Sequence, residues 1–303
     1  MSKFTKILKD KYGIHPSEVM ETQGGWAALA FEVSGGENHY FLKVYEKHRA
    51  STSKLTALID QYSPILVWLE TNTDLKGRIP VPLLTKDGHY KCEDDVNIYL
   101  LYPFIHGDTV GGSELSNQQV KEFAHMIATL HSYGEEIPVP TKVLVEQFDV
   151  PFLEQLESVL SKEEEKLPEE LRELINTYKD NVVQSIKEIR ILSTQLKSST
   201  LDMVLCHTDL HHWNLMQSTS LVLIDWEGLK IAPVEADMMF LVDKPYFDEF
   251  FKIYKEVHKD YSINEQALRF YSIKRKLEDT WNLSSSCYLK NLIRIEKKRL
   301  LLI

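Results

Sequence analysis

The feature that most constrains the fold is a pattern of short apolar runs and polar breaks between residues 203 and 227. An apolar run at 203–206 leads into a polar loop, and a second run at 215–216 leads out of it. Turn-forming residues at 217–220 then precede the apolar run 221–224. Short apolar segments separated by turn residues are typical of β-strands joined in hairpins. The sequence therefore predicts a hairpin that brings the polar loop beside the end of the last strand.

Four polar residues occupy defined positions in this predicted hairpin. His207, Asp209 and Asn214 lie on the loop, and Asp225 directly follows the last strand. The spacing His-x-Asp-x-x-x-x-Asn, followed by a strand ending in Asp, is typical of protein-kinase-like phosphoryl transfer. We expect Asp209 to accept the proton of an attacking hydroxyl and His207 to brace the loop. Asn214 and Asp225 offer oxygen ligands for Mg²⁺ on the phosphates of a nucleotide.

A zinc site is an alternative interpretation of the same loop, because it contains three histidines and an aspartate. However, His211 and His212 are consecutive, and consecutive side chains of an extended segment point to opposite sides. The chain also has no HExxH motif and no cysteine cluster. A surface turn whose polar residues have no function is also disfavoured, since Asp225 directly follows four apolar residues. These observations favour phosphoryl transfer.

Composition restricts the partners. The chain has 303 residues, and its formal net charge of −10 would repel the phosphates of a nucleic acid but suits a small cationic substrate. No apolar run approaches the roughly 18 residues of a membrane span, and the first twelve residues alternate lysine with apolar residues rather than forming a signal peptide. The three scattered cysteines are typical of reduced thiols in the cytoplasm. We therefore expect a cytoplasmic protein that binds neither membrane nor nucleic acid.

The first 102 residues are rich in strand patterns. Helices are predicted at 3–12 and 51–72. Strands are predicted on either side of the glycine pair in 19–33 and at 39–45, 81–84 and 96–102. These segments predict a small antiparallel sheet.

The pattern changes to helical after residue 102. Helical periodicity is strong at 116–133, nearly continuous at 148–196, and resumes near Tyr246. A β-rich region 1–102 followed by a helical region 103–303 indicates a bilobal α+β fold of the protein-kinase type. The hairpin 203–227 would then belong to the helical lobe.

The first lobe is predicted to bind the nucleotide. Gln23, Gly24 and Gly25 lie between the first two strands, where small residues let backbone N–H groups approach phosphates. Lys43 lies between two apolar residues of the next strand, so its side chain should point to the opposite face. We expect Lys43 to contact the α- and β-phosphates. A plain hairpin turn and an exposed strand lysine are the alternatives.

Two more contacts are expected around the nucleotide. Asp60 is the best placed acid on the helix 51–72 to hold Lys43. The connection 102–105 should cradle adenine. Proline has no N–H, so Pro103 can offer its C=O as acceptor, and Ile105 can offer its N–H as donor.

Together these motifs resemble the aminoglycoside phosphotransferase family, to which choline and related small-molecule kinases also belong. The resemblance spans nearly the whole chain. It rests on His207-x-Asp209-x-x-x-x-Asn214, Ile224-Asp225-Trp226 and Pro233-x-x-x-Asp237, and on the segments 102–105, 232–240 and 277–279, which look most like the spectinomycin phosphotransferase branch. Members of that branch typically have Glu where this chain has Asp60. The resemblance implies ATP or GTP, Mg²⁺ and a hydroxylated acceptor.

A cationic acceptor would need carboxylates near Asp209. Glu227, Glu278 and Asp279 are the candidates, and Trp213 or Trp226 could supply an aromatic wall for the cation. The helical segment 145–200 would form the outer wall of the acceptor pocket.

We therefore predict an ATP- and Mg²⁺-dependent O-phosphotransferase that acts on a small cationic molecule. The expected acceptor is an aminoglycoside or aminocyclitol antibiotic such as spectinomycin, with resistance as the consequence. A metabolic kinase for choline, an amino alcohol or a sugar is the alternative within enzymes. A nucleotide-binding pseudokinase or scaffold is the alternative of another class. The oligomeric state stays open.

Overall fold

A computed structural model describes residues 3–25, 27–49, 51–161 and 169–285. The chain divides into two compact units. The first contains Met1–Val145, Met203–Ile231 and Phe240–Tyr261, and the second contains Glu146–Asp202, Ala232–Met239 and Ser262–Ile303. The predicted boundary near residue 103 stays a prediction.

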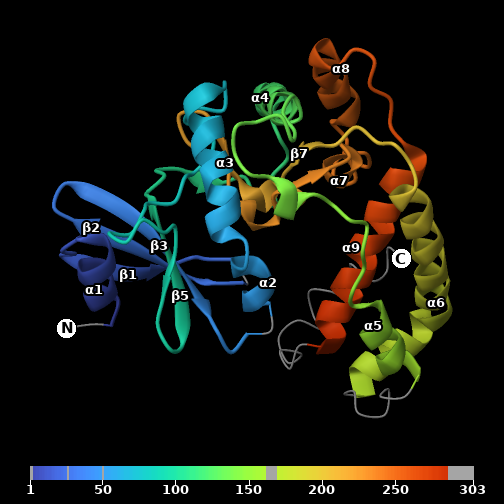
Figure 1. Cartoon of the computed structure of the whole chain (residues 1–303), viewed down its shortest axis with the longest axis horizontal. Coiled ribbons are helices and arrows are strands. Elements are labelled where there is room, and N and C mark those ends of the chain that lie inside the picture. The colour runs from blue at the N-terminus through green and yellow to red at the C-terminus, as the bar shows by residue number, and fades with distance from the viewer. Residues whose placement is uncertain (1–2, 26, 50, 162–168, 286–303) are drawn as a thin grey trace. The chain divides into compact units, whose positions relative to one another are not determined.

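The first unit contains an antiparallel five-stranded sheet in the order β1-β2-β3-β5-β4 (Figure 1). The strands are β1 (Glu18–Thr22), β2 (Leu29–Gly35), β3 (Asn38–Glu46), β4 (Cys92–Glu93) and β5 (Asn97–Pro103). The central strand β3 pairs with β2 and β5, with Lys43 opposite Ala30 on one side and Leu100 on the other. The sequence thus predicted the sheet and the place of Lys43 on its third strand.

Alternation along β3 gives the sheet two different faces. Leu42 and Val44 are fully buried in an apolar cluster with Phe31, Val33 and Leu8. Leu8 is the first residue of η1 (Leu8–Tyr12), which continues the short helix α1 (Lys3–Ile7), and both pack against this face. Burying side chains of this size stabilises the fold by roughly 1.5–3 kcal/mol each. Lys43 and Tyr45 therefore lie on the opposite face.

The predicted strand at 81–84 is wrong. This segment forms no strand, and the fourth strand of the sheet is β4 instead. Only Leu83 N donates to β5, at 2.7 Å from Leu101 O. Pro82 has no N–H, so a regular ladder cannot continue through this segment.

Helices complete the first unit. The predicted helix 51–72 is two helices, α2 (Thr52–Thr56) and α3 (Ile59–Asn72), and Pro64 lies inside α3. The predicted helix 116–133 is α4 (Asn117–Leu130). Ser116 caps it in a capping box with Gln119, which satisfies two backbone N–H groups at its start. Helix α8 (Phe247–Val257) packs on α4, with the Phe123 and Phe250 rings 5.4 Å apart.

The predicted hairpin also lies in the first unit. Its segments are β7 (Val204–Cys206), η4 (His212–Asn214), β8 (Leu215–Gln217), β9 (Leu221–Leu223) and η5 (Trp226–Gly228). Strands β8 and β9 pair antiparallel with Leu215 opposite Leu223, and β6 (Asp108–Thr109) extends this sheet beyond β8. A second small sheet joins β7 to β10 (Lys230–Ala232). These pairings confirm the hairpin.

The second unit is helical. It contains α5 (Leu153–Ser161), α6 (Glu169–Lys197), the short α7 (Glu235–Met238) and α9 (Glu265–Ser285). Helices α6 and α9 lie side by side (Figure 1), and Arg269 forms two hydrogen bonds of 2.7 and 2.8 Å with Glu188 between them. Within the described ranges, none of the helices is long and apolar enough to cross a membrane.

Candidate active site

His207 connects the two halves of the hairpin. Its side chain is fully buried, and its Nδ1 accepts a hydrogen bond of 3.3 Å from Asp209 N. Nε2 must then carry the proton, and it lies 2.9 Å from Ile224 O. The Trp226 ring packs edge-on against the imidazole, 4.7 Å between centroids. This single side chain therefore fixes the loop of Asp209 relative to the strand end that precedes Asp225.

Asp209 and Asn214 lie against each other on the loop. Asn214 Nδ2 donates to Asp209 O at 2.9 Å and to Asp209 Oδ2 at 3.2 Å. His211 Nε2 lies 3.2 Å from the same Asp209 oxygen. Both side-chain hydrogen bonds use the Asn214 nitrogen, and Oδ1 has no hydrogen-bond partner among the described residues, so this oxygen can coordinate a cation. His212 instead contacts Ser113 O and the Tyr246 hydroxyl, so the two histidines diverge as expected for an extended segment.

Asp225 and Glu227 both contact Lys43. Asp225 has a left-handed backbone, with φ of 65°, and η5 follows it directly. Lys43 Nζ lies 2.9 Å from Asp225 Oδ1 and 2.5 Å from Glu227 Oε1. The Lys43 side chain is 12% exposed, Glu227 is 8% exposed and Asp225 is 41% exposed. Lys43 thus meets the metal-ligand candidate Asp225 directly.

Tyr45 completes this cluster and was missed by the sequence analysis. Its ring is fully buried, and its hydroxyl donates to Glu227 Oε1. Burial and the Glu227 carboxylate raise the pKa of Tyr45 well above its ordinary value, so the hydroxyl stays a donor. Burial opposes the charge on Lys43, but the Asp225 and Glu227 carboxylates outweigh it and raise the pKa of the ammonium group. The period-two spacing from Lys43 was the signal that could have identified Tyr45.

Gln23, Gly24 and Gly25 form the exposed connection after β1. A Cβ on Gly24 would lie 2.8 Å from the Ala30 Cβ and 3.1 Å from Ala28 O, whereas one on Gly25 would meet nothing within 4 Å. Gly24 is therefore required for the close approach of this loop to β2. The phosphate contact of the three residues stays a prediction.

The backbone at Pro103 faces away from β3. Phe104 N donates to His39 O at 3.1 Å and Lys47 N donates to Val96 O at 2.8 Å, which identifies the hydrogen-bonded pairs of β3 and β5. Tyr40 and Pro103 form a pair of the other kind, so the Pro103 C=O points to the opposite edge. In the described part of the chain, Ile105 N–H has no hydrogen-bond partner. These backbone directions are compatible with the adenine contact of Pro103 and Ile105, which stays a prediction.

Asp60 does not hold Lys43. It lies in the first turn of α3, and its Oδ1 accepts a hydrogen bond of 2.8 Å from Tyr90 N. The structure gives Lys43 two other carboxylates, so the predicted Lys43–Asp60 pair is not supported.

The candidate acceptor residues differ in position. Trp213 is 56% exposed on η4, and its ring lies over Gly111, where an added Cβ would meet it at 3.1 Å. Glu278 and Asp279 lie on α9 in the second unit, where Asp279 Oδ1 contacts Arg275 Nε at 3.3 Å. The segment 145–200 supplies α5 and α6 of that unit. An acceptor role for these residues stays a prediction.

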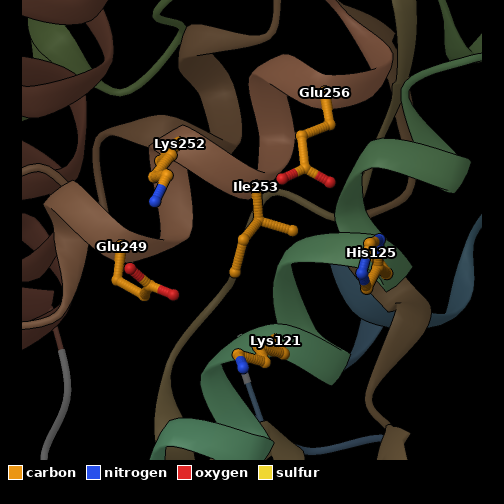
Figure 2. Close-up of a pocket in the computed structure, with 6 residues that line it drawn as sticks. All are labelled: Lys121, His125, Glu249, Lys252, Ile253 and Glu256. Carbon is orange, nitrogen blue, oxygen red and sulfur yellow. The ribbon is translucent and has the colours of Figure 1, made fainter.

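A hollow of about 310 Å³ lies between α4 and α8. Figure 2 shows its lining side chains, which are Lys121, His125, Glu249, Lys252, Ile253 and Glu256. Opposite charges alternate around it, and none of the predicted site residues lines it. The predicted chemistry therefore belongs to the hairpin and the sheet rather than to this hollow.

Several solved structures with a similar fold are named as phosphotransferases or kinases of small molecules. Spectinomycin phosphotransferase APH(9)-Ia, in complex with ADP and spectinomycin, is 20% identical, with a TM-score of 0.72 over 98% of this chain and 92% of its own. The GDP and kanamycin complex of APH(2″)-IIia is 17% identical, with a TM-score of 0.58 over 98% and 94%. A microcompartment-associated aminopropanol kinase is 13% identical, with a TM-score of 0.59 over 94% and 89%. The fold is therefore protein-kinase-like and α+β, as predicted.

The family follows from the sequence match. The model of the phosphotransferase enzyme family matches residues 18–271, which include β1, the hairpin and part of α9. The chain belongs to this phosphotransferase enzyme family. No curated protein is significantly similar to it in sequence.

Proposed function

We propose that the chain transfers the γ-phosphoryl group of ATP to a hydroxyl of a small molecule, with Mg²⁺ as the metal. The observation that carries this proposal is the convergence of Lys43 with Asp225, next to the loop on which Asp209 contacts Asn214. Transfer of a phosphoryl group requires charge neutralisation and in-line positioning more than covalent chemistry. Lys43 supplies a positive charge, and the other three side chains supply oxygen ligands for a metal and a position for the acceptor hydroxyl.

The residues have distinct roles in this proposal. Asp209 orients the acceptor hydroxyl and takes its proton as the hydroxyl oxygen bonds to the γ-phosphorus. The bond from that phosphorus to the bridging oxygen breaks, and ADP keeps the electron pair. Lys43 neutralises charge on the α- and β-phosphates, and the backbone of 23–25 lies close to them. Pro103 C=O and Ile105 N–H hold adenine. GTP would require the same phosphate contacts.

The donor set fits a hard cation. Asn214 Oδ1 and the Asp225 carboxylate are oxygen ligands of the kind that Mg²⁺ prefers. Asn214 has its nitrogen occupied by Asp209, and Asp225 is the more exposed of the two acids on Lys43. Bound there, the metal would neutralise phosphate charge. The same two oxygens make zinc a poorer fit.

The acceptor is a small hydroxylated molecule, and a cation suits the net charge of −10. The exposed indole of Trp213 favours a cationic or flat partner next to the loop of Asp209. Likeness to the spectinomycin complex supports an aminocyclitol or aminoglycoside, with antibiotic resistance as the outcome. Likeness to an aminopropanol kinase supports the alternative, a metabolic kinase for an amino alcohol, choline or a sugar. The described cysteines Cys92 and Cys206 are buried thiols that form no disulfide, which favours the cytoplasm.

A panel assay tests this proposal. Purified protein with Mg²⁺ and [γ-³²P]ATP or GTP is offered spectinomycin, kanamycin, choline, aminopropanol and simple sugars. We expect labelled phosphate on one class of hydroxyl compound and no transfer when EDTA removes the metal. Nucleotide binding without transfer to any acceptor, and without slow hydrolysis of ATP, would favour the pseudokinase alternative.

A further inference from the structure

The buried carboxylate that contacts Lys43 belongs to Glu227 in η5 and not to an acid on helix α3. A lysine that contacts phosphates must keep a fixed position, because its long side chain otherwise has many rotamers. The sequence pointed to Asp60 on α3 as the acid that fixes it. That residue accepts from Tyr90 N instead, at 2.8 Å.

Glu227 has the contacts that this task requires. Its Oε1 lies 2.5 Å from Lys43 Nζ and also accepts from the Tyr45 hydroxyl. Two donors, which are two residues apart on the same face of β3, therefore share one oxygen. Tyr45 is fully buried and Glu227 is 8% exposed, so water competes little for these bonds. A charge-assisted hydrogen bond in such surroundings is strong and directional.

The local backbone explains how Glu227 reaches Lys43. The left-handed residue Asp225 and the turn η5 follow β9 directly. Trp226 is buried, and its Nε1 donates to Leu223 O at 2.7 Å, which fixes the turn from within. With residue 226 fixed inward, the side chains of 225 and 227 both reach the same ammonium group.

The two acids that contact Lys43 differ in how exposed their side chains are, and this difference suits them to different tasks. Asp225 is 41% exposed and can offer oxygen to a metal, whereas Glu227 is 8% exposed and contacts Lys43 and Tyr45 on β3. We propose that Glu227 is the positioning residue of Lys43 and takes the place of a carboxylate on α3. This inference rests on the proposed nucleotide role of Lys43.

Two measurements on Glu227→Gln test the proposal. In the protein without nucleotide, the rate at which acetic anhydride acetylates Lys43, followed by mass spectrometry, should rise severalfold because the ammonium loses a stabilising charge. In steady-state assays, KM for ATP should rise about tenfold or more, since a hydrogen bond between charged groups is lost. The KM for the acceptor should change less than twofold. Glu227→Asp, which keeps the charge, should recover part of the ATP affinity.

Glu46→Gln is the matched control, because Glu46 lies on the same strand and its carboxylate contacts Arg49, three residues along the chain. It should change neither measurement by more than twofold. The proposal is overturned if Glu227→Gln leaves both measurements unchanged, or if Asp60→Asn reproduces its loss of ATP affinity. Should Glu227→Gln fail to fold, Tyr45→Phe removes one of the two donors and should still raise the KM for ATP. A wild-type protein that binds no nucleotide would refute the proposed function instead. The acetylation rates would still test whether Glu227 positions Lys43.

Discussion

Thr208 Oγ1 donates a hydrogen bond of 2.7 Å to the carbonyl oxygen of Gly228. The bond joins the residue before Asp209 to the end of the turn that begins after Asp225. Thr208 has a φ of 68°, a left-handed conformation that is rare for a β-branched residue. Asp225 shares this conformation. Such backbone strain costs of order 1–3 kcal/mol per residue and is typical of functional sites.

The close approach at Gly228 gives the first prediction. A Cβ on Gly228 would collide with Thr208 Oγ1 and would lie 2.9 Å from His207 O. Gly228→Ala must therefore displace the loop that carries Asp209. We expect kcat to fall at least tenfold, and the free energy of unfolding to fall by about 1–3 kcal/mol, as for other overpacked sites. Steady-state assays and urea denaturation check this result. Gly112→Ala is the control, since its Cβ would meet no atom within 4 Å.

The second prediction concerns Asp209. Asp209→Ala removes the group that orients and deprotonates the hydroxyl, but not Lys43 or Asp225. Turnover should fall by roughly a thousandfold, within the range for loss of a general base. Nucleotide affinity, measured by calorimetry, should stay within a few-fold of the wild type. Lost ATP binding with preserved turnover would contradict the assignment of Asp209.

The third prediction concerns the base of the hairpin. Glu122 on α4 accepts from Leu221 N at 3.0 Å, from Gln118 Nε2 at 3.0 Å and from Arg78 Nη1 at 3.1 Å. Burial opposes its charge, but these hydrogen bonds outweigh burial and lower the pKa of Glu122. We expect Glu122→Gln to reduce the free energy of unfolding by about 1 kcal/mol at pH 7.

The sign of the pH dependence follows from that lowered pKa. The carboxylate of Glu122 is charged in both folded and unfolded chains above its unfolded pKa, so its full contribution is present there. The contribution is lost as pH falls through the lower pKa of the folded state. The stability difference between wild type and Glu122→Gln should therefore shrink below about pH 4.5. Chemical denaturation at several pH values measures this difference in the free energy of unfolding. The control substitution is Glu114→Gln, because Glu114 is exposed. A difference that grows in acid would refute the role of Glu122.

Local patterns were sufficient for much of this fold. The hairpin was predictable because short apolar runs alternate with turn residues, and the orientation of Lys43 was predictable from alternation along one strand. The capped helix after Ser116 followed from periodicity in the same way. Prediction failed at 81–84, where an apolar run suggested a strand although Pro82 cannot donate to a ladder.

The partners of Lys43 were not predictable from local patterns. The sequence pattern indicated a carboxylate on the next helix, but Asp60 there accepts a hydrogen bond from Tyr90 N. Which acid reaches an ammonium group depends on how distant segments pack, and no local period encodes that choice. Glu227 was therefore predicted as an acceptor contact, although its oxygen lies against Lys43 and Tyr45.

The separation of these residues along the chain determines when each becomes available for folding during synthesis. Lys43 lies 182 residues before Asp225 and 184 before Glu227. Translation proceeds from the N-terminus at about 5–20 residues per second. The ribosome therefore releases Lys43 some ten seconds or more before either acid. Throughout that interval the nascent sheet carries a cation on its future inner face with neither acid yet made, so this face can close only late in folding.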